Sequence, residues 1–273
     1  MPELPEVETV KRDLTQSVLG QKIESLRVLD SRVIRGISQP LFIKCLTGAM
    51  VQNISRRGKA IICTLDNGQH LVVQLMMTGQ LVYLPELPEV LAKETKIIFR
   101  LSNKTHLLYN DQRLFGRLSI VDDLAGFKHF VDLGPEPFDA SFNPKFIRDS
   151  LKTKTAAVKK VLLDHTFVAG IGNIYASEIL FRSGIDPRRQ GRKLKPAEIE
   201  RMHRETIEVL NEAILHRGSS MRNYRDGRGE KGTFNDRIRV YAREGEPCLN
   251  CKKPINKIVQ GGRSTFFCKQ CQH

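Results

Sequence analysis

Four cysteines near the end of the chain constrain its fold more than any other feature. They form two Cys-x-x-Cys pairs separated by sixteen residues, Cys248 with Cys251 and Cys268 with Cys271. This spacing is typical of a zinc ribbon, in which each pair lies on a tight turn and four thiolates complete a tetrahedron around one structural Zn²⁺. A disulfide framework and a redox pair are the alternatives, and an intracellular setting disfavours both. We therefore predict a metal-braced finger that is too small to fold alone.

The other two cysteines and the first residues of the chain both favour an intracellular protein. Cys45 and Cys63 stand alone in apolar stretches, where we expect small buried side chains rather than a disulfide. The first residues are acidic and have no apolar segment behind basic residues, unlike a secretory signal. No apolar run approaches the roughly 18 residues that cross a bilayer. We therefore expect a cytoplasmic protein.

The hydrophobic pattern of residues 1–120 changes from helix to strand. Residues 1–20 have apolar side chains at helical spacing, with Pro5 in the first turn and Glu6 and Glu8 complementing the positive end of the helix dipole. Short β segments with turn signals between them follow, which favours an antiparallel sandwich. The predicted strands are Ser25–Val28, Ile61–Leu65, His70–Leu75, Lys96–Leu101, His106–Tyr109 and Leu118–Val121.

Beyond the Leu133–Pro137 segment, where two prolines disrupt both helix and strand, the pattern becomes helical. A glycine-rich turn at 168–173 joins two of the helices, and residues 217–233 form a long glycine-rich loop before a β-like tail. We predict an α+β fold in three parts, 1–134, 135–233 and 234–273. The predicted helices are Pro144–Leu151, Thr155–Asp164, Asn173–Ser183 and Pro196–His216.

Basic side chains are concentrated in the second half of the chain. Residues 141–273 carry 27 Lys and Arg against 14 Asp and Glu, whereas residues 1–140 carry 17 against 16. Such a region is typical of a polyanion partner, because each Lys or Arg that meets a phosphate releases condensed counterions. A merely solvated cationic surface is the alternative. No basic amphipathic helix with an aromatic face points to a membrane, so the sequence favours nucleic acid.

Three separated segments together carry a family resemblance. The chain opens PELPEVETV from Pro2 to Val10, contains GNIYASE from Gly172 to Glu178, and has VYAREGEPC from Val240 to Cys248. In this order, with the remaining cysteines after them, they resemble the bacterial formamidopyrimidine-DNA glycosylase family over essentially the whole length. The resemblance implies an N-terminal helix, a β-sandwich, a helix–two-turn–helix element and a zinc ribbon finger. It also implies a bifunctional glycosylase and AP lyase that removes 8-oxoguanine and formamidopyrimidines from duplex DNA in base-excision repair.

The resemblance places the chemistry at the start of the chain. Removal of Met1 would expose the secondary amine of Pro2, and an α-amino group with a pKa of about 8 is partly unprotonated at neutral pH. The resemblance implies that this amine attacks the sugar C1′ and that Glu3 is the general acid and base. Lys59 matches a family lysine implicated in β-elimination, and Arg263 matches a zinc-finger arginine linked to δ-elimination. An ordinary chain start and an ordinary turn lysine are the alternatives for Pro2 and Lys59.

Further residues are expected to contact DNA, and four of them match family positions. Reaching C1′ requires extrusion of the nucleotide, which leaves a void in the base stack. The resemblance implies that Met77, Arg113 and Phe115 fill this void and that Arg113 bonds to the orphaned cytosine. Taken singly, the methionine and the phenylalanine would more often be core residues. Asn173, at a helix start, matches a family contact to a backbone phosphate, and Lys152 and Lys154 are expected as supporting phosphate contacts.

Some positions depart from the family pattern or stay unassigned. Lys159 is expected as a supporting phosphate contact, and segment 217–233 corresponds to the loop that closes over an extruded base, through amides that the sequence does not identify. Gln74 and Glu94 stand where the family often has DNA-binding histidines, and Ala242 replaces a usual glycine. The two missing histidines predict a weaker or redistributed phosphate clamp.

Two other functions compete with this interpretation. An endonuclease VIII-like glycosylase for oxidised pyrimidines has the same fold, but it typically opens Pro-Glu-Gly-Pro-Glu, whereas this chain has Leu4. A non-catalytic protein that keeps the finger for damage binding is the other alternative. We predict a monomeric enzyme whose partner is double-stranded DNA with an oxidised purine opposite cytosine.

Overall fold

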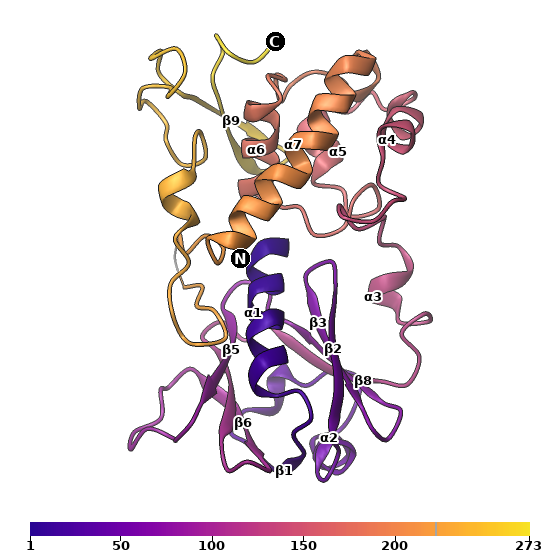
Figure 1. The fold of residues 1–273 in the computed structure, drawn as a ribbon, viewed down its shortest axis with the longest axis vertical. Helices are drawn as coiled ribbons and strands as arrows, with labels where there is room; N and C mark the ends of the chain where they lie inside the picture. The colour runs from indigo at the N-terminus through magenta and orange to yellow at the C-terminus, as the bar shows by residue number, and fades with distance from the viewer. Residues whose placement is uncertain (222) are drawn as a thin grey trace. The chain divides into compact units, whose positions relative to one another are not determined.

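The computed structural model describes residues 1–221 and 223–273 and divides the chain into two compact units (Figure 1). The first unit contains Met1–Val131 and His216–Asn235, and the second contains Asp132–Leu215 and Asp236–His273. Arg222, within the predicted base-capping loop, lies outside the described residues. The division into three parts stays a prediction.

Helix α1, Leu4–Ser17, begins the first unit and is capped at its start. Glu3 and Glu6 form a reciprocal capping box, which satisfies two N–H groups that a helix start otherwise leaves without partners. The apolar side chains at helical spacing along α1 are fully buried. The helix predicted at the beginning of the chain is therefore confirmed.

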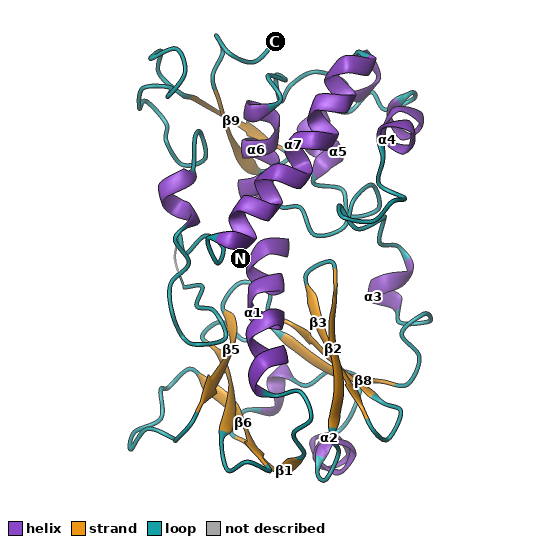
Figure 2. Ribbon diagram, viewed as in Figure 1, coloured by secondary structure: helices purple, strands orange, loops and turns teal. Residues whose placement is uncertain are grey.

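Two four-stranded antiparallel sheets complete the framework of the first unit (Figure 2). Their strand orders are β1-β6-β7-β5 and β2-β3-β4-β8. Side chains from both sheets and from α1 share one hydrophobic core, so the predicted antiparallel β-sandwich is confirmed. The first sheet contains β1 Ile23–Val28, β5 Gly79–Leu84, β6 Thr95–Leu101 and β7 His106–Asp111, and the second contains β2 Val51–Arg57, β3 Ala60–Leu65, β4 His70–Gln74 and β8 Arg117–Val121.

The expectation of strands alone between residues 22 and 120 is wrong at α2, Gln39–Leu46. A serine N-cap and a proline in the first turn start this helix, and the buried Phe42 ties it to the core. The sequence also does not single out β2, because only two of its seven side chains are buried and its alternation is weak. Two shorter helices are η1, Ser31–Val33, and α3, Lys128–Val131.

Helices dominate the second unit, as predicted. Helix α5 is shorter than the predicted Thr155–Asp164, because Ala157 forms an isolated bridge with Gln190 and the Val158 N–H donates to the Arg189 carbonyl at 2.7 Å. Among the described residues, no helix has both the length and the apolar character that a bilayer crossing requires. The remaining elements of the described chain are α4 Pro144–Leu151, α5 Val158–Leu162, α6 Asn173–Arg182, η2 Gly191–Lys193, α7 Pro196–Leu215, η3 Phe234–Arg237 and the antiparallel hairpin of β9 Asn256–Gln260 with β10 Arg263–Phe267.

The glycine-rich segment 217–233 packs with the first unit, against α1. Arg217 donates from Nε to the fully buried Asp226 and from Nη2 to Asp13, both at 2.6 Å. The Gly227 N–H also donates to Asp13, at 3.0 Å. Apart from an isolated bridge that involves Ser219, the described residues of this segment form neither helix nor strand, in agreement with the predicted loop.

Candidate active site and nucleic-acid interface

Pro2 and Glu3 lie at the buried start of α1. Pro2 is buried, and the Glu3 side chain is 3% exposed. The Glu3 N–H donates to Glu6 Oε2 at 2.7 Å, while the Glu3 carboxylate accepts the Glu6 N–H. This pairing restrains the backbone next to Pro2, and the positive end of the helix dipole lies beside a carboxylate.

Glu6 also binds the loop 217–233. Its Oε1 accepts the Ser219 N–H at 2.7 Å, and its backbone carbonyl accepts the Tyr224 hydroxyl at 3.3 Å. Gly218 has φ +79°, and a Cβ there would lie 2.7 Å from Glu6 Oε1, so only glycine permits this approach. Sequence reasoning gave Glu6 a dipole role alone; the capping-box spacing from Glu3 was the signal that it restrains the chain start.

Lys59 lies in the tight turn between β2 and β3 and is half-buried. Gly58 adopts φ +57° in this turn. Arg56, just before it, donates from Nε to Glu8 on α1 at 3.0 Å and from Nη1 to the Gly58 carbonyl at 2.9 Å. The Arg56–Glu8 pair, whose side chains are only 8% and 12% exposed, therefore ties the Lys59 turn to the helix that begins after Glu3.

The three residues predicted to fill the void lie on two neighbouring turns. Met77 is in the turn between β4 and β5, and Arg113 and Phe115 are in the turn between β7 and β8. Phe115 is 47% exposed, and the Arg113 guanidinium lies 4.6 Å from the centre of its ring. Because Gly79 of β5 pairs with Asp111 of β7, both turns leave the sheet from adjacent strands. The structure thus places these three residues at the same end of two adjacent strands of the sandwich.

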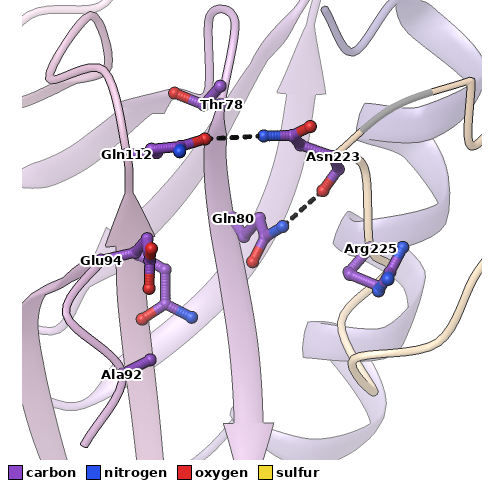
Figure 3. A pocket seen from close by; sticks show the side chains of 8 residues that line it. Thr78, Gln80, Ala92, Glu94, Gln112, Asn223 and Arg225 are labelled. Atoms are coloured by element: carbon purple, nitrogen blue, oxygen red, sulfur yellow. Dashed lines mark hydrogen bonds between the residues drawn. The ribbon is translucent and has the colours of Figure 1, made fainter.

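A polar cavity of about 350 Å³ lies beside these turns, within the first unit. Figure 3 shows Asn223, from the glycine-rich loop, facing two glutamines of the sandwich. The Asn223 Nδ2 donates to Gln112 Oε1 at 2.9 Å, and the Gln80 amide donates to the Asn223 carbonyl at 2.5 Å. The lining residues are Thr78, Gln80, Ala92, Glu94, Asn110, Gln112, Asn223 and Arg225.

In the second unit, Asn173 and the hairpin that carries Arg263 are joined through Ser264. Asn173 is the first residue of α6, and its Nδ2 donates to the Ser264 carbonyl at 2.9 Å. Lys159 is 1% exposed, and its ammonium donates to the same carbonyl and to the Thr265 hydroxyl, both at 2.9 Å. Arg263 itself is exposed at the start of β10.

Lys154 differs from Lys159 in its surroundings. It lies exposed in the connection after α4, and its backbone carbonyl accepts the Arg192 N–H at 3.0 Å. Two lysines that look equivalent in the sequence are therefore placed differently. The ammonium of Lys154 faces solvent, and that of Lys159 braces the β9–β10 hairpin.

The four cysteines of the tail converge as a metal site requires. Their sulfurs all lie within 4.8 Å of one another, with Cys248 to Cys271 at 3.9 Å and Cys251 to Cys268 at 3.4 Å. Zn–S bonds of about 2.3 Å in a tetrahedron place sulfurs about 3.8 Å apart, so the donor set fits zinc. The Lys253 N–H lowers the pKa of Cys251 to about 7, whereas burial raises the pKa of Cys268 and of Cys271.

The two isolated cysteines are not part of this group. All six cysteines are free of disulfides. Cys63 is buried, and burial raises its pKa to about 12. Cys45 is half-buried rather than buried as expected, because it lies near the end of the short helix α2.

Comparison with known proteins decides the family. The models of the formamidopyrimidine-DNA glycosylase N-terminal domain, the formamidopyrimidine-DNA glycosylase H2TH domain and the zinc finger found in FPG and IleRS match residues 1–118, 133–225 and 245–273. A formamidopyrimidine-DNA glycosylase of Pelotomaculum thermopropionicum is 42% identical over 274 residues, which cover 100% of this chain and 99% of the relative. This chain belongs to the formamidopyrimidine-DNA glycosylase family.

Solved structures of a formamidopyrimidine-DNA glycosylase from Lactococcus lactis have the same fold. A mutant of that FPG in complex with a Fapy-dG containing DNA has a TM-score of 0.92 at 35% identity and covers 99% of each chain. The complex of the L. lactis enzyme with an abasic site containing DNA gives the same TM-score, identity and coverage. The α+β fold predicted from the sequence is confirmed.

Family membership establishes the class of activity. The chain is a DNA glycosylase of base-excision repair, in a family that combines N-glycosylase with AP lyase activity. The family zinc finger and the four converging cysteines show that the protein holds one structural zinc ion. Because four thiolates leave no open position on a tetrahedral ion, the zinc stabilises the finger and takes no part in the chemistry.

Two departures from the formamidopyrimidine-DNA glycosylase pattern are visible in the structure. Gln74 is 7% exposed, and its amide nitrogen lies 2.8 Å from Nε2 of His129 on α3. Burial and the nearby Arg117 lower the pKa of His129. Glu94 lines the polar cavity.

Proposed function

We propose that the enzyme excises oxidised purines, 8-oxoguanine and formamidopyrimidines, from double-stranded DNA with Pro2 as the nucleophile. The observation that carries this proposal is the buried Pro2–Glu3 segment, which the capping box with Glu6 restrains at the start of α1. A nucleophile and an acid/base group in adjacent, restrained positions are what covalent catalysis requires. The L. lactis complexes with Fapy-dG and abasic DNA support the same substrate class.

In this proposal the reaction begins on the Pro2 nitrogen of a chain that has lost Met1, because a nitrogen in the Met1–Pro2 peptide bond is not nucleophilic. The amine attacks C1′ while Glu3 protonates the opening deoxyribose, and the base leaves. A secondary amine then forms a cationic iminium, which acidifies the C2′ proton and promotes β-elimination. We assign Lys59 to that step and Arg263 to the following δ-elimination.

We further propose that Met77, Arg113 and Phe115 occupy the void left by the extruded nucleotide. Extrusion costs a few kcal/mol, which inserted side chains offset by restoring stacking and pairing. The exposed Phe115 ring suits a wedge, and the Arg113 guanidinium offers donors to the orphaned cytosine. Cytosine recognition protects the genome, because excision of 8-oxoguanine opposite adenine would fix a mutation.

Lys154, Asn173 and Arg263 are proposed as contacts to the DNA backbone. The exposed lysine and arginine supply cationic groups, and Asn173 lies at the start of α6, where helix N–H groups favour an anion. The excess of basic residues in the second half of the chain supports this assignment. We also propose that the protein works as a monomer in the bacterial cytoplasm, with functional parts at 1–134, 135–233 and 234–273.

Borohydride trapping tests the proposal. The purified protein, checked by intact mass for loss of Met1, is incubated with an 8-oxoguanine duplex and sodium borohydride. We expect a covalent adduct at Pro2 for the processed chain, and none for the same chain after N-terminal acetylation. An acetylated chain that is trapped equally well would contradict the role of Pro2. Faster excision of thymine glycol than of 8-oxoguanine would contradict the purine assignment and favour the endonuclease VIII alternative.

A further inference from the structure

We propose that Asp111 and Thr78 are positioning residues that hold the Met77 turn and the Arg113–Phe115 turn together as one rigid insert. The inference rests on the proposed void-filling role of the side chains on these turns. It adds two residues that touch neither the base nor the sugar. Their effect is to fix the relative placement of three side chains that come from two separate connections in the sandwich.

Asp111 is the centre of the arrangement. It lies at the end of β7 with no exposed surface. Its Oδ2 accepts the Gly116 N–H at 2.7 Å, and its Oδ1 accepts the Arg113 N–H at 3.2 Å. A buried carboxylate is costly unless its oxygens are hydrogen-bonded. These two bonds therefore hold both ends of the turn that carries Arg113 and Phe115.

Thr78 connects the other turn to the same carboxylate. Its hydroxyl donates to Asp111 Oδ1 at 2.5 Å and accepts the Arg113 N–H at 3.0 Å. Met77 is the preceding residue, so the hydroxyl of one turn bonds to the backbone of the other. Figure 3 shows Thr78 beside Gln112, which in turn bonds to Asn223 of the glycine-rich loop.

Close packing leaves the two turns little freedom to separate. A Cβ at Gly79 would lie 2.8 Å from the Tyr109 hydroxyl, and a Cβ at Gly116 would lie 1.6 Å from the same atom. Met76 and Leu114, one in each turn, adopt φ of +53° and +57°, which non-glycine residues rarely do. Such strained residues persist where surrounding bonds over-determine the backbone, as the Asp111 network does here.

Preorganisation of the two turns explains why this network matters for function. Side chains that enter a base stack lose freedom, and a scaffold that already restrains their backbones lowers that cost. The network should therefore affect steps that need an opened duplex. It should not affect Pro2 chemistry on a strand that has no stack to open.

The test compares Thr78→Val with Thr95→Val. Thr95 is equally suited to substitution, because it is 3% exposed and its hydroxyl donates to Asn110 Oδ1 at 2.9 Å on the same strand β7. Each change removes one threonine hydroxyl that bonds to a β7 side chain; Thr78 is half-buried, and Thr95 is buried. Thr78→Ser keeps the hydroxyl and serves as the rescue variant. Melting temperatures confirm that all variants fold.

Two substrates separate positioning from chemistry. For Thr78→Val we expect roughly tenfold slower single-turnover excision of 8-oxoguanine from duplex DNA, because the hydrogen bonds of Thr78 to the Asp111 carboxylate and from the Arg113 N–H are lost. We also expect a smaller preference for cytosine over adenine opposite the lesion. Cleavage of a single-stranded abasic oligonucleotide should match the unsubstituted enzyme. Thr78→Ser should restore duplex excision, and Thr95→Val should behave like the unsubstituted enzyme on both substrates.

Three results would overturn the inference: unchanged duplex excision by Thr78→Val, an equal loss on both substrates, or the same loss in Thr95→Val. Each can occur while the unsubstituted enzyme excises 8-oxoguanine normally, so each refutes the positioning role alone. An unsubstituted enzyme that cleaves neither substrate would instead refute the proposed function, and the inference with it.

Discussion

The two units differ in how they hold the segments that carry the residues proposed to contact DNA. In the first unit, buried carboxylates accept backbone N–H groups: Glu6 binds the loop 217–233, and Asp111 binds the turn that carries Arg113. In the second, the β9–β10 hairpin is held by donors that reach a backbone carbonyl, and a metal braces the chain that flanks it. The first arrangement therefore depends on groups that cannot leave the protein, and the second depends on an ion that can.

Removal of zinc should produce the largest difference in stability between the two units, because only the second unit holds the metal. Chelation, or Cys268→Ser, should unfold the finger and lower affinity for duplex DNA by about a hundredfold, because the phosphate contacts proposed for Arg263 would be lost. Metal content and a binding titration at fixed salt measure this. The first unit should keep its protection from hydrogen exchange along β7. Full DNA affinity in the metal-free protein would contradict the role of the finger.

A smaller loss of DNA affinity is expected when the hairpin loses the hydrogen bonds donated by the buried Lys159. Lys159→Met removes both hydrogen bonds that the ammonium donates to β10 and should weaken duplex binding roughly tenfold while zinc stays bound. Lys160→Met is the matched control, since Lys160 is the next residue and is exposed. If both variants lose the same affinity at every salt concentration, net charge rather than the Ser264 contact explains the effect.

The ion pairs of Glu8 in the first unit should contribute less to stability at acidic pH. Burial raises the pKa of Glu8, but hydrogen bonds from Arg12 and Arg56 outweigh it, and the pKa lies below its ordinary value of 4.5. Ionised Glu8 therefore stabilises the fold above that pH, and this contribution disappears as pH falls through the lowered pKa. Glu8→Gln should cost about 1 kcal/mol near pH 7.

Urea denaturation of the protein and the Glu8→Gln variant at several pH values checks this. The difference in unfolding free energy should shrink below about pH 4.5. Glu24→Gln, which breaks the largely exposed pair with Arg100, is the control and should have a smaller effect at every pH. A difference that is unchanged at pH 3 would rule out Glu8 ionisation as its origin.

The smallest expected change is a gain in the second unit. Ala242 adopts φ +60°, a conformation that favours glycine, and it follows the segment that Glu178 binds through the N–H groups of Arg239, Val240 and Tyr241. Ala242→Gly should relieve this strain and raise the free energy of unfolding. The net gain should be only about 0.5 kcal/mol, because glycine also increases the conformational entropy of the unfolded chain. Calorimetry would show a slightly higher melting temperature; a lower one would contradict the strain.

Much of the site could be predicted because its signals are local. The cysteine pairs identify the metal ligands through a spacing of a few residues. The Glu3–Glu6 capping box is an equally local signal, but it was missed because Glu6 was assigned to the helix dipole alone. The position of Ala242 was also visible, as a departure from a usual glycine. Helix α2 was missed because eight residues within a β-rich region give too short a periodic signal.

Sequence alone determined the family, the zinc ligands and the residues at the chain start, because each depends on a short motif or a periodic pattern. Tertiary structure alone decided which groups hold these residues in place. Thr78 meets Asp111 across 33 residues, Lys159 meets Ser264 across 105, and Ser219 meets Glu6 across 213. No pattern in the sequence encodes such pairs, because hydrogen bonds between distant segments exist only after the sandwich and the helices have packed.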